Sequence, residues 1–283
     1  MTAVMTIAGY GLREALRRKV FGVVLILTVG FLTLYWLGVH FLYENLGNVG
    51  PPVGVDARTF VGATVFGLAM FGTLFLGTVL AIFLTLGVVR GDAERGLLQP
   101  LVVRPIGRST LLFARWLGAV AVCAPYVGIV YAASMLVTGL TGHWWPDHVV
   151  TPGVELAAAV ALVAAMSLLG SVFLSSTANG IAVFMVFGAG LVAGLLGTIG
   201  HGLNSHGLER AAKVAAYLIP FEGLYQDALR EIVSRTTGLT GFLLELGPFG
   251  GGYTGGPWVR IWAVAYFALL AGLAALGFSR RDL

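Results

Sequence analysis

The sequence predicts an all-α, polytopic membrane protein with six transmembrane helices. Hydrophobic residues make up 58% of the chain and charged residues only 11%, whereas a soluble domain has about 25% charged residues. The mean hydropathy is +0.90, so lipid is expected to solvate most of the surface. The 41 glycines suit closely packed membrane helices. The single cysteine, Cys123, excludes an intrachain disulfide.

Six apolar runs reach the ~20 residues that a spanning helix needs. They are Val20–Phe41, Thr64–Val89, Leu112–Thr138, Val154–Leu174, Gly180–Gly200 and Trp258–Phe278. The first run is too long for a secretory signal, and no small-residue cleavage site follows it. We therefore expect a single transmembrane domain over residues 1–283 in a multi-pass protein.

The basic residues predict the orientation. One side of the predicted membrane receives Arg13, Arg17, Arg18, Lys19, Arg90, Arg95, Arg104, Arg108, Arg115, Arg280 and Arg281. Positive residues mark the cytoplasmic side, and an even number of spans places both termini there. We expect the inner (cytoplasmic) membrane, with both termini in the cytoplasm.

The long external connection over residues 201–257 is expected to be helical. Two stretches show helical periodicity, Leu208–Ile219 and Phe221–Val233, with Pro220 between them. Asp227 and Arg230 have the spacing of a pair on one helix face. The glycine-rich stretch over residues 247–257 predicts a flexible hinge. We interpret Pro220, Phe221, Asp227 and Arg230 as parts of an external gate; a surface excursion is the alternative.

The predicted spans contain no ionisable residue in their interiors. Glu155 and Arg260 fall at helix starts, and Glu44 lies just beyond a helix end. Since ionisable residues within membranes mark ion pathways, this pattern argues against proton- or sodium-coupled transport. No Gly-Lys-Ser/Thr loop is present, so the chain is not expected to hydrolyse ATP, and no cofactor is expected to bind it.

Two further patterns carry minor hypotheses. His143, His148, His201 and His206 all map to the external side and are weak candidates for a metal site; ordinary loop histidines are the alternative. Gly190 and Gly194 form a small-xxx-small pair that Gly197 continues. This pair favours either packing within the chain or a contact with a second subunit.

The cytoplasmic segment over residues 90–110 is longer than a simple connection. Asp92 and Glu94 suit the first turn of a short helix, and two prolines limit its length. Its apolar face is expected to carry Leu97, Leu98 and Leu101. Such a face fits a groove on a partner protein, although an interfacial helix resting on lipid headgroups is also possible.

This segment carries a resemblance to a known family. "AERGLLQPLVVRPIGRSTLLFARWLG" is similar to the region after the second span of ABC-2-type transporter permeases, particularly the NosY-type permeases linked to multi-copper enzyme maturation. The matching positions are Glu94, Gly96, Leu98, Pro105, Arg108 and Arg115. Leu97 and Arg115 replace the threonine and lysine that are common there. "GYGLREALRRKVF" resembles the family's N-terminal interfacial elbow, here within residues 1–19.

The resemblance implies the membrane subunit of an ATP-binding cassette transporter, an exporter. Two copies of a separate ATPase subunit, which uses ATP and Mg²⁺, would bind the coupling helix, and a second permease, expected to be identical, would complete the transporter. No nucleic-acid partner is expected. Two other classes stay open at this point. The chain could be a membrane scaffold or mechanotransmitting anchor for an extracytoplasmic assembly, or an intramembrane enzyme, although no nucleophile–base motif supports the latter.

Overall fold

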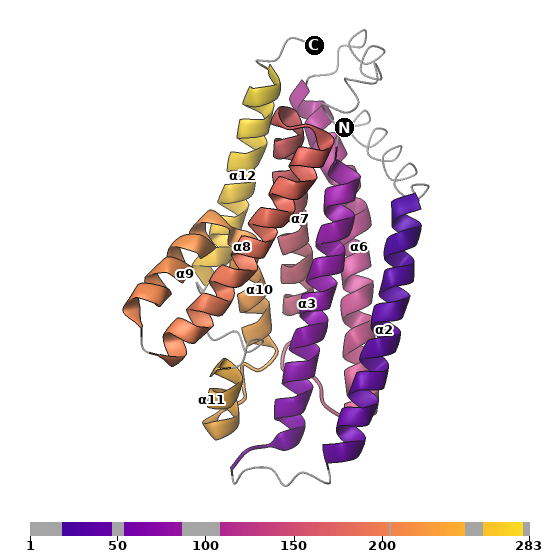
Figure 1. The fold of residues 1–283 in the computed structure, drawn as a ribbon, viewed down its shortest axis with the longest axis vertical. Coiled ribbons are helices and arrows are strands. Elements are labelled where there is room, and N and C mark those ends of the chain that lie inside the picture. Colours follow the sequence, from indigo (N-terminus) through magenta and orange to yellow (C-terminus); the bar gives the residue numbers. More distant parts are fainter. Residues whose placement is uncertain (1–18, 47–53, 87–107, 204, 247–256, 280–283) are drawn as a thin grey trace.

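The computed structural model describes residues 19–46, 54–86, 108–203, 205–246 and 257–279. Over these residues the chain is helical, and Figure 1 shows an elongated bundle. The helices are α2 (Lys19–Asn45), α3 (Ala57–Thr85), α6 (Arg108–Gly142), α7 (Val150–Phe173), α8 (Ser176–Gly202), α9 (His206–Leu218), α10 (Pro220–Glu231), α11 (Gly238–Leu246) and α12 (Pro257–Ser279).

Six of these helices, namely α2, α3, α6, α7, α8 and α12, are long and apolar enough to cross a membrane. The prediction of an all-helical fold is therefore confirmed over the described residues, and the six apolar helices are compatible with a multi-pass membrane protein. The elbow within residues 1–19 and the segment over residues 90–107 lie outside the described residues, apart from Lys19, which begins α2. The predicted hinge over residues 247–256 also lies outside them.

α3 begins at Ala57, earlier than the predicted start at Thr64, because Asp56 caps the helix. The Asp56 carboxylate accepts hydrogen bonds from the backbone N–H of Arg58 (3.1 Å) and Thr59 (3.4 Å) and from the Thr59 hydroxyl (2.6 Å). These bonds hold the pKa of Asp56 below its usual range. An aspartate before a helix is a sequence-level start signal, so this boundary was predictable.

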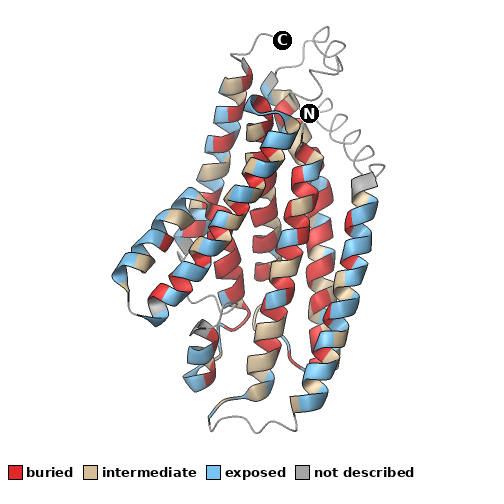
Figure 2. Ribbon diagram, in the orientation of Figure 1, coloured by how far each residue is buried: buried red, intermediate tan, exposed pale blue. Residues whose placement is uncertain are grey.

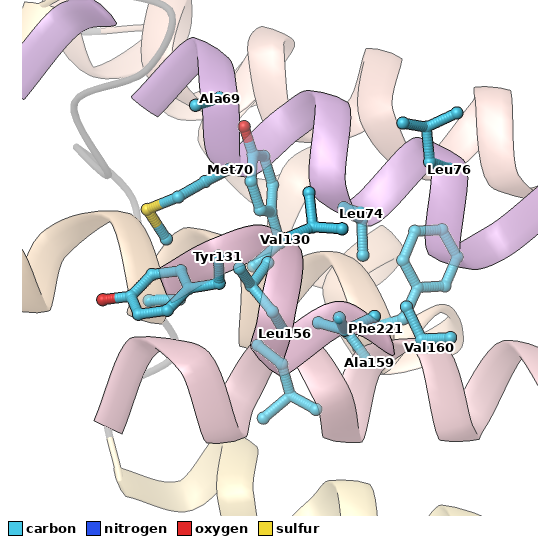
Figure 3. Close-up of a cluster of buried hydrophobic side chains, with 14 of the residues drawn as sticks. Ala69, Met70, Leu74, Leu76, Val130, Tyr131, Leu156, Ala159, Val160 and Phe221 are labelled. Carbon is cyan, nitrogen blue, oxygen red and sulfur yellow. The ribbon is translucent and has the colours of Figure 1, made fainter. Parts of the chain in front are cut away.

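α3 and α7 form the centre of the bundle, and α2, α8 and α12 surround them. Most residues of α3 and α7 are buried, whereas the outer helices expose large apolar side chains, as Figure 2 shows. Figure 3 shows α3, α6, α7 and α10 contributing side chains to one apolar cluster, including Met70, Tyr131, Leu156 and Phe221. The exposed apolar faces of the outer helices suit contact with lipid.

Two hydrogen bonds between side-chain hydroxyl groups join α2 to α6. Tyr35 Oη lies 2.5 Å from Thr138 Oγ1, and Tyr126 Oη lies 2.5 Å from Thr28 Oγ1. Each threonine already donates its proton to a backbone carbonyl of its own helix, so the tyrosines are the donors. Because helices in lipid gain little from the hydrophobic effect, such hydrogen bonds help to position the peripheral helix α2.

We predict a measurable coupling across the second of these pairs. Tyr126→Phe and Thr28→Val each remove one partner, and the double-mutant cycle should give a coupling of about 0.6 kcal/mol, the average for membrane helices. The measurement is reversible unfolding in mixed micelles. Additive effects of the two substitutions would show that the pair does not stabilise the α2–α6 contact.

Candidate functional site

α10 is a polar helix in the interior of the bundle. Every residue from Pro220 to Leu229 is buried, although the segment includes Glu222, Gln226 and Asp227. It packs against α7, α8, α9 and α12. In Figure 1 α9 runs back along α8 and α10 returns, so that the two form a hairpin beside the start of α12. Buried ionisable residues within a membrane protein are the usual mark of a functional site.

Local sequence signals explain why α10 forms. Pro220 occupies the first turn, where its missing N–H costs no hydrogen bond. Glu222 lies in the first turn and Arg230 in the last, which complements the helix dipole at both ends. The predicted break at Pro220 is therefore a junction between two helices.

Aromatic residues hold the tip of the α9–α10 hairpin against its neighbours. The Phe221 ring stacks on Phe187 of α8, with centroids 5.3 Å apart. Trp262 of α12 donates its indole N–H to the carbonyl of Tyr217 at the end of α9 (2.8 Å). These contacts place the hairpin tip between α8 and α12, and they exclude a surface excursion for α10.

Arg260, near the start of α12, contacts carboxylate groups from two other helices. Its Nε donates to Asp227 Oδ2 (3.0 Å) and its Nη2 to Glu231 Oε1 (2.8 Å), both on α10. Glu155 Oε1 of α7 lies 2.7 Å from the same Nε. Glu155 and Arg260 fall at the starts of two predicted helices and are 105 positions apart in the chain. The fold brings their side chains together.

Of the three carboxylates around Arg260, that of Glu155 has the fewest hydrogen-bond partners. The residue is 4% exposed, and neither of its carboxylate oxygens accepts a hydrogen bond, because the single Nε–H of Arg260 points to Asp227. His148 Nε2 lies 3.6 Å from Glu231 Oε2. With one arginine beside the carboxylates of Glu155, Asp227 and Glu231, negative charge exceeds positive charge within this group of residues.

A second buried carboxyl group lies on the α8-facing side of α10. Glu222 Oε1 accepts a hydrogen bond from Gln226 Nε2 (2.7 Å), and the two residues are 3% and 4% exposed. The carboxyl group sits against Gly194 of α8, where any Cβ would overlap it. The Gly190–Gly194 face is thus occupied by α10 of the same chain, and Gly197 is buried as well.

These contacts correct the expectation that the interior lacks ionisable groups. Glu155 lies inside the spanning helix α7, and Glu222 is wholly enclosed by the bundle. Sequence reasoning placed Glu222 in an external loop and so gave it no role. The positions of ionisable residues therefore no longer speak against proton- or ion-coupled transport.

The other predicted site residues have mixed outcomes. Asp227 bonds to Arg260 of α12, and Arg230 is exposed at the end of α10. Glu94, Gly96, Leu97, Leu98, Leu101 and Pro105 lie outside the described residues, and Arg108 begins α6. Among the described residues no three histidine, cysteine or acidic side chains are placed to hold a metal ion. His143 is exposed, His206 lies 3.9 Å from Glu209, and the side chain of His201 is not described.

One sequence signal could have located the site. Glu222 and Gln226, like Asp227 and Glu231, are four residues apart, so each pair follows one face of a helix. α10 thereby has two adjacent polar faces, one toward α8 and one toward α7 and α12. The burial of both faces depended on the return of α10 into the bundle, which the periodicity of the sequence does not indicate.

The sequence matches no known protein-family profile, and comparison with curated proteins finds no match.

We predict that Arg260 stabilises the docked position of α10. Arg260→Met leaves the carboxylates of Glu155, Asp227 and Glu231 without their cation and should lower the unfolding free energy by about 2 kcal/mol. This loss of unfolding free energy is smaller than for a wholly buried ion pair, because the Arg260 side chain is 43% exposed. Thermal unfolding in detergent measures the change. Arg210→Met, an exposed substitution on α9, is the control, and equal effects of the two would contradict the role of Arg260.

Gly194→Ala should displace the α9–α10 hairpin from α8. The added methyl group would overlap the Glu222 carboxyl group, and overpacking of this kind costs about 1–3 kcal/mol. Hydrogen–deuterium exchange of α9 and α10 should rise by the corresponding factor. Gly188→Ala is the matched control on the same helix, since nothing lies within 4 Å of its added Cβ. Unchanged exchange in Gly194→Ala would show that α8 and α10 pack differently.

Proposed function

We propose that the chain is the permease subunit of an ATP-binding cassette transporter of the ABC-2 type, coupled to a separate ATPase. The observation that carries the proposal is the Glu-x-Gly, Pro-x-x-Arg segment between α3 and α6, with Glu94, Gly96, Pro105 and Arg108 at the matching positions. Six helices able to cross a membrane support it. So does the buried polar helix α10, which packs against α7, α8 and α12, an arrangement suited to a gate.

In this proposal the two ends of the bundle have different tasks. The segment over residues 90–107 joins α3 to α6 at the end that carries the predicted cytoplasmic charges, where an ATPase would bind Leu97, Leu98 and Leu101. The α9–α10 hairpin lies toward the opposite side. ATP binding can move a gate only if it favours one arrangement of the helices over another. The Arg260 ion pairs and the Glu222–Gly194 contact are the interactions that such a movement would break.

Replacement of residues 91–101 by a Gly/Ser linker tests the proposal. We expect the full-length tagged chain to co-purify with an ATP-hydrolysing subunit and to stimulate its ATPase activity in proteoliposomes. The linker variant should lose most of this stimulation while it still inserts into the membrane. His40→Ala, a substitution near the other end of α2, is the control.

The same experiment discriminates the proposed function from the alternative. If neither the native chain nor the linker variant co-purifies with an ATPase or stimulates its activity, the chain would be a membrane scaffold for an extracytoplasmic assembly. ATPase binding without nucleotide-dependent movement of any cargo would indicate a mechanotransmitting subunit.

A further inference from the structure

Glu222 and Gln226 form an isolated polar pair in the contact between α10 and α8. Both side chains are almost completely buried, and one hydrogen bond of 2.7 Å joins Gln226 Nε2 to Glu222 Oε1. Gly194 provides the space for the carboxyl group. A charged carboxylate enclosed in this way would lose its hydration and keep one hydrogen bond in return, which is strongly unfavourable.

Two oxygen atoms of this pair lack a hydrogen-bond donor. They are Glu222 Oε2 and Gln226 Oε1, and both are inaccessible to solvent. A carboxylic acid and a primary amide are complementary, because each carries a donor and an acceptor. One proton on Glu222 Oε2 would remove the buried charge and turn Oε2 into a hydrogen-bond donor, the kind of group that Gln226 Oε1 lacks.

Among the described side chains, the neighbouring helices supply no cation in place of that proton, and α8 carries no described charged side chain. The charged groups described on α7 and α12 are Glu155 and Arg260, and these face one another. α9 carries His206, Glu209, Arg210 and Lys213, and α10 itself carries Asp227, Arg230 and Glu231. Burial raises the Glu222 pKa and the Gln226 hydrogen bond lowers it, and together they leave it at about 8. Tyr225 is the nearby titratable group, and burial and the charge of Glu222 raise its pKa as well.

We propose that Glu222 and Gln226 form a proton-binding site that links docking of the α9–α10 hairpin on α8 to pH. In the docked state the Glu222 carboxyl group holds one proton. When the hairpin leaves α8, the Glu222 carboxyl group becomes hydrated and releases its proton from Oε2 to water. When the hairpin docks again, the carboxylate binds a proton from water. The proposal concerns the hairpin alone and holds whether or not an ATPase drives the chain.

The direction of the pH effect follows from the two pKa values. In water the carboxyl group has its ordinary pKa of 4.5, and in the docked state the pKa is about 8. Below the ordinary value both states are protonated, so docking is strongest there. Between the two values each pH unit weakens docking by up to about tenfold. Above pH ~8 the loss is complete and docking no longer changes with pH.

Infrared difference spectroscopy of the full chain in lipid vesicles tests the site directly. A protonated carboxylic acid has a C=O stretching band that a carboxylate lacks. The spectra are recorded in a Glu155→Gln background, because the buried Glu155 carboxyl group can contribute a band of its own. In that background we expect a band at neutral pH that disappears with a midpoint near pH 8, and its absence when Glu222→Gln is added. Glu44→Gln, an exposed control, should keep the band. A Glu222 carboxyl group already ionised at pH 6 would overturn the proposal.

A second variant separates proton binding from a structural role. Gln226→Leu keeps Glu222 but removes the amide that bonds to it, both the donor that favours the ionised form and the acceptor that favours the acid, so the midpoint should shift away from pH 8. Hydrogen exchange of α9 and α10, corrected for the intrinsic pH dependence with α3 peptides, should rise between pH 5 and pH 8 in the native chain. The rise should vanish in Glu222→Gln, which mimics the protonated acid. A midpoint unmoved by Gln226→Leu, or a rise that persists in Glu222→Gln, would overturn the proposal.

Discussion

The burial of a polar helix is the constraint on which this structure depends. α10 lies inside the bundle with Glu222, Gln226 and Asp227 enclosed among apolar neighbours. A buried polar group without a partner is costly, so the surrounding helices must either pair these side chains or make room for them. Arg260 on α12 does the first, and Gly194 on α8 does the second.

The two faces of α10 use opposite electrostatic solutions. Toward α7 and α12, Asp227 and Glu231 meet a guanidinium group whose fork allows two hydrogen bonds in one plane. Toward α8, the Glu222 carboxyl group has an uncharged amide as its partner. The Arg260 pairs stabilise ionised carboxylates by an opposite charge, whereas the amide beside Glu222 favours a neutral carboxylic acid. Movement of α10 would therefore separate ion pairs on one side and expose a proton-binding group on the other.

The spanning helices hold α10 in place by a different physical principle. Helices in lipid associate through close packing and a few hydrogen bonds. Gly77 lets α3 approach Val127 of α6 and Val160 of α7, while tyrosine hydroxyls fasten α2 to α6. The centre of the bundle is consequently dense around α3 and α7, and the hairpin rests on that dense side. For a transporter subunit, as we propose, this division provides a rigid body and a smaller element able to move against it.

The amino-acid sequence determined the helical class, the six apolar spans and the break at Pro220, because apolar run length and proline chemistry are local properties. The start of α3 at Ala57 was also readable from Asp56. Only the tertiary structure decided that Glu155 meets Arg260 and that Glu222 lies against Gly194. These residues come from different helices, and their burial arises from the return of α10 into the bundle. Hydropathy assigned that segment to the exterior because it is polar, whereas packing enclosed it between helices that pair or accommodate its polar groups.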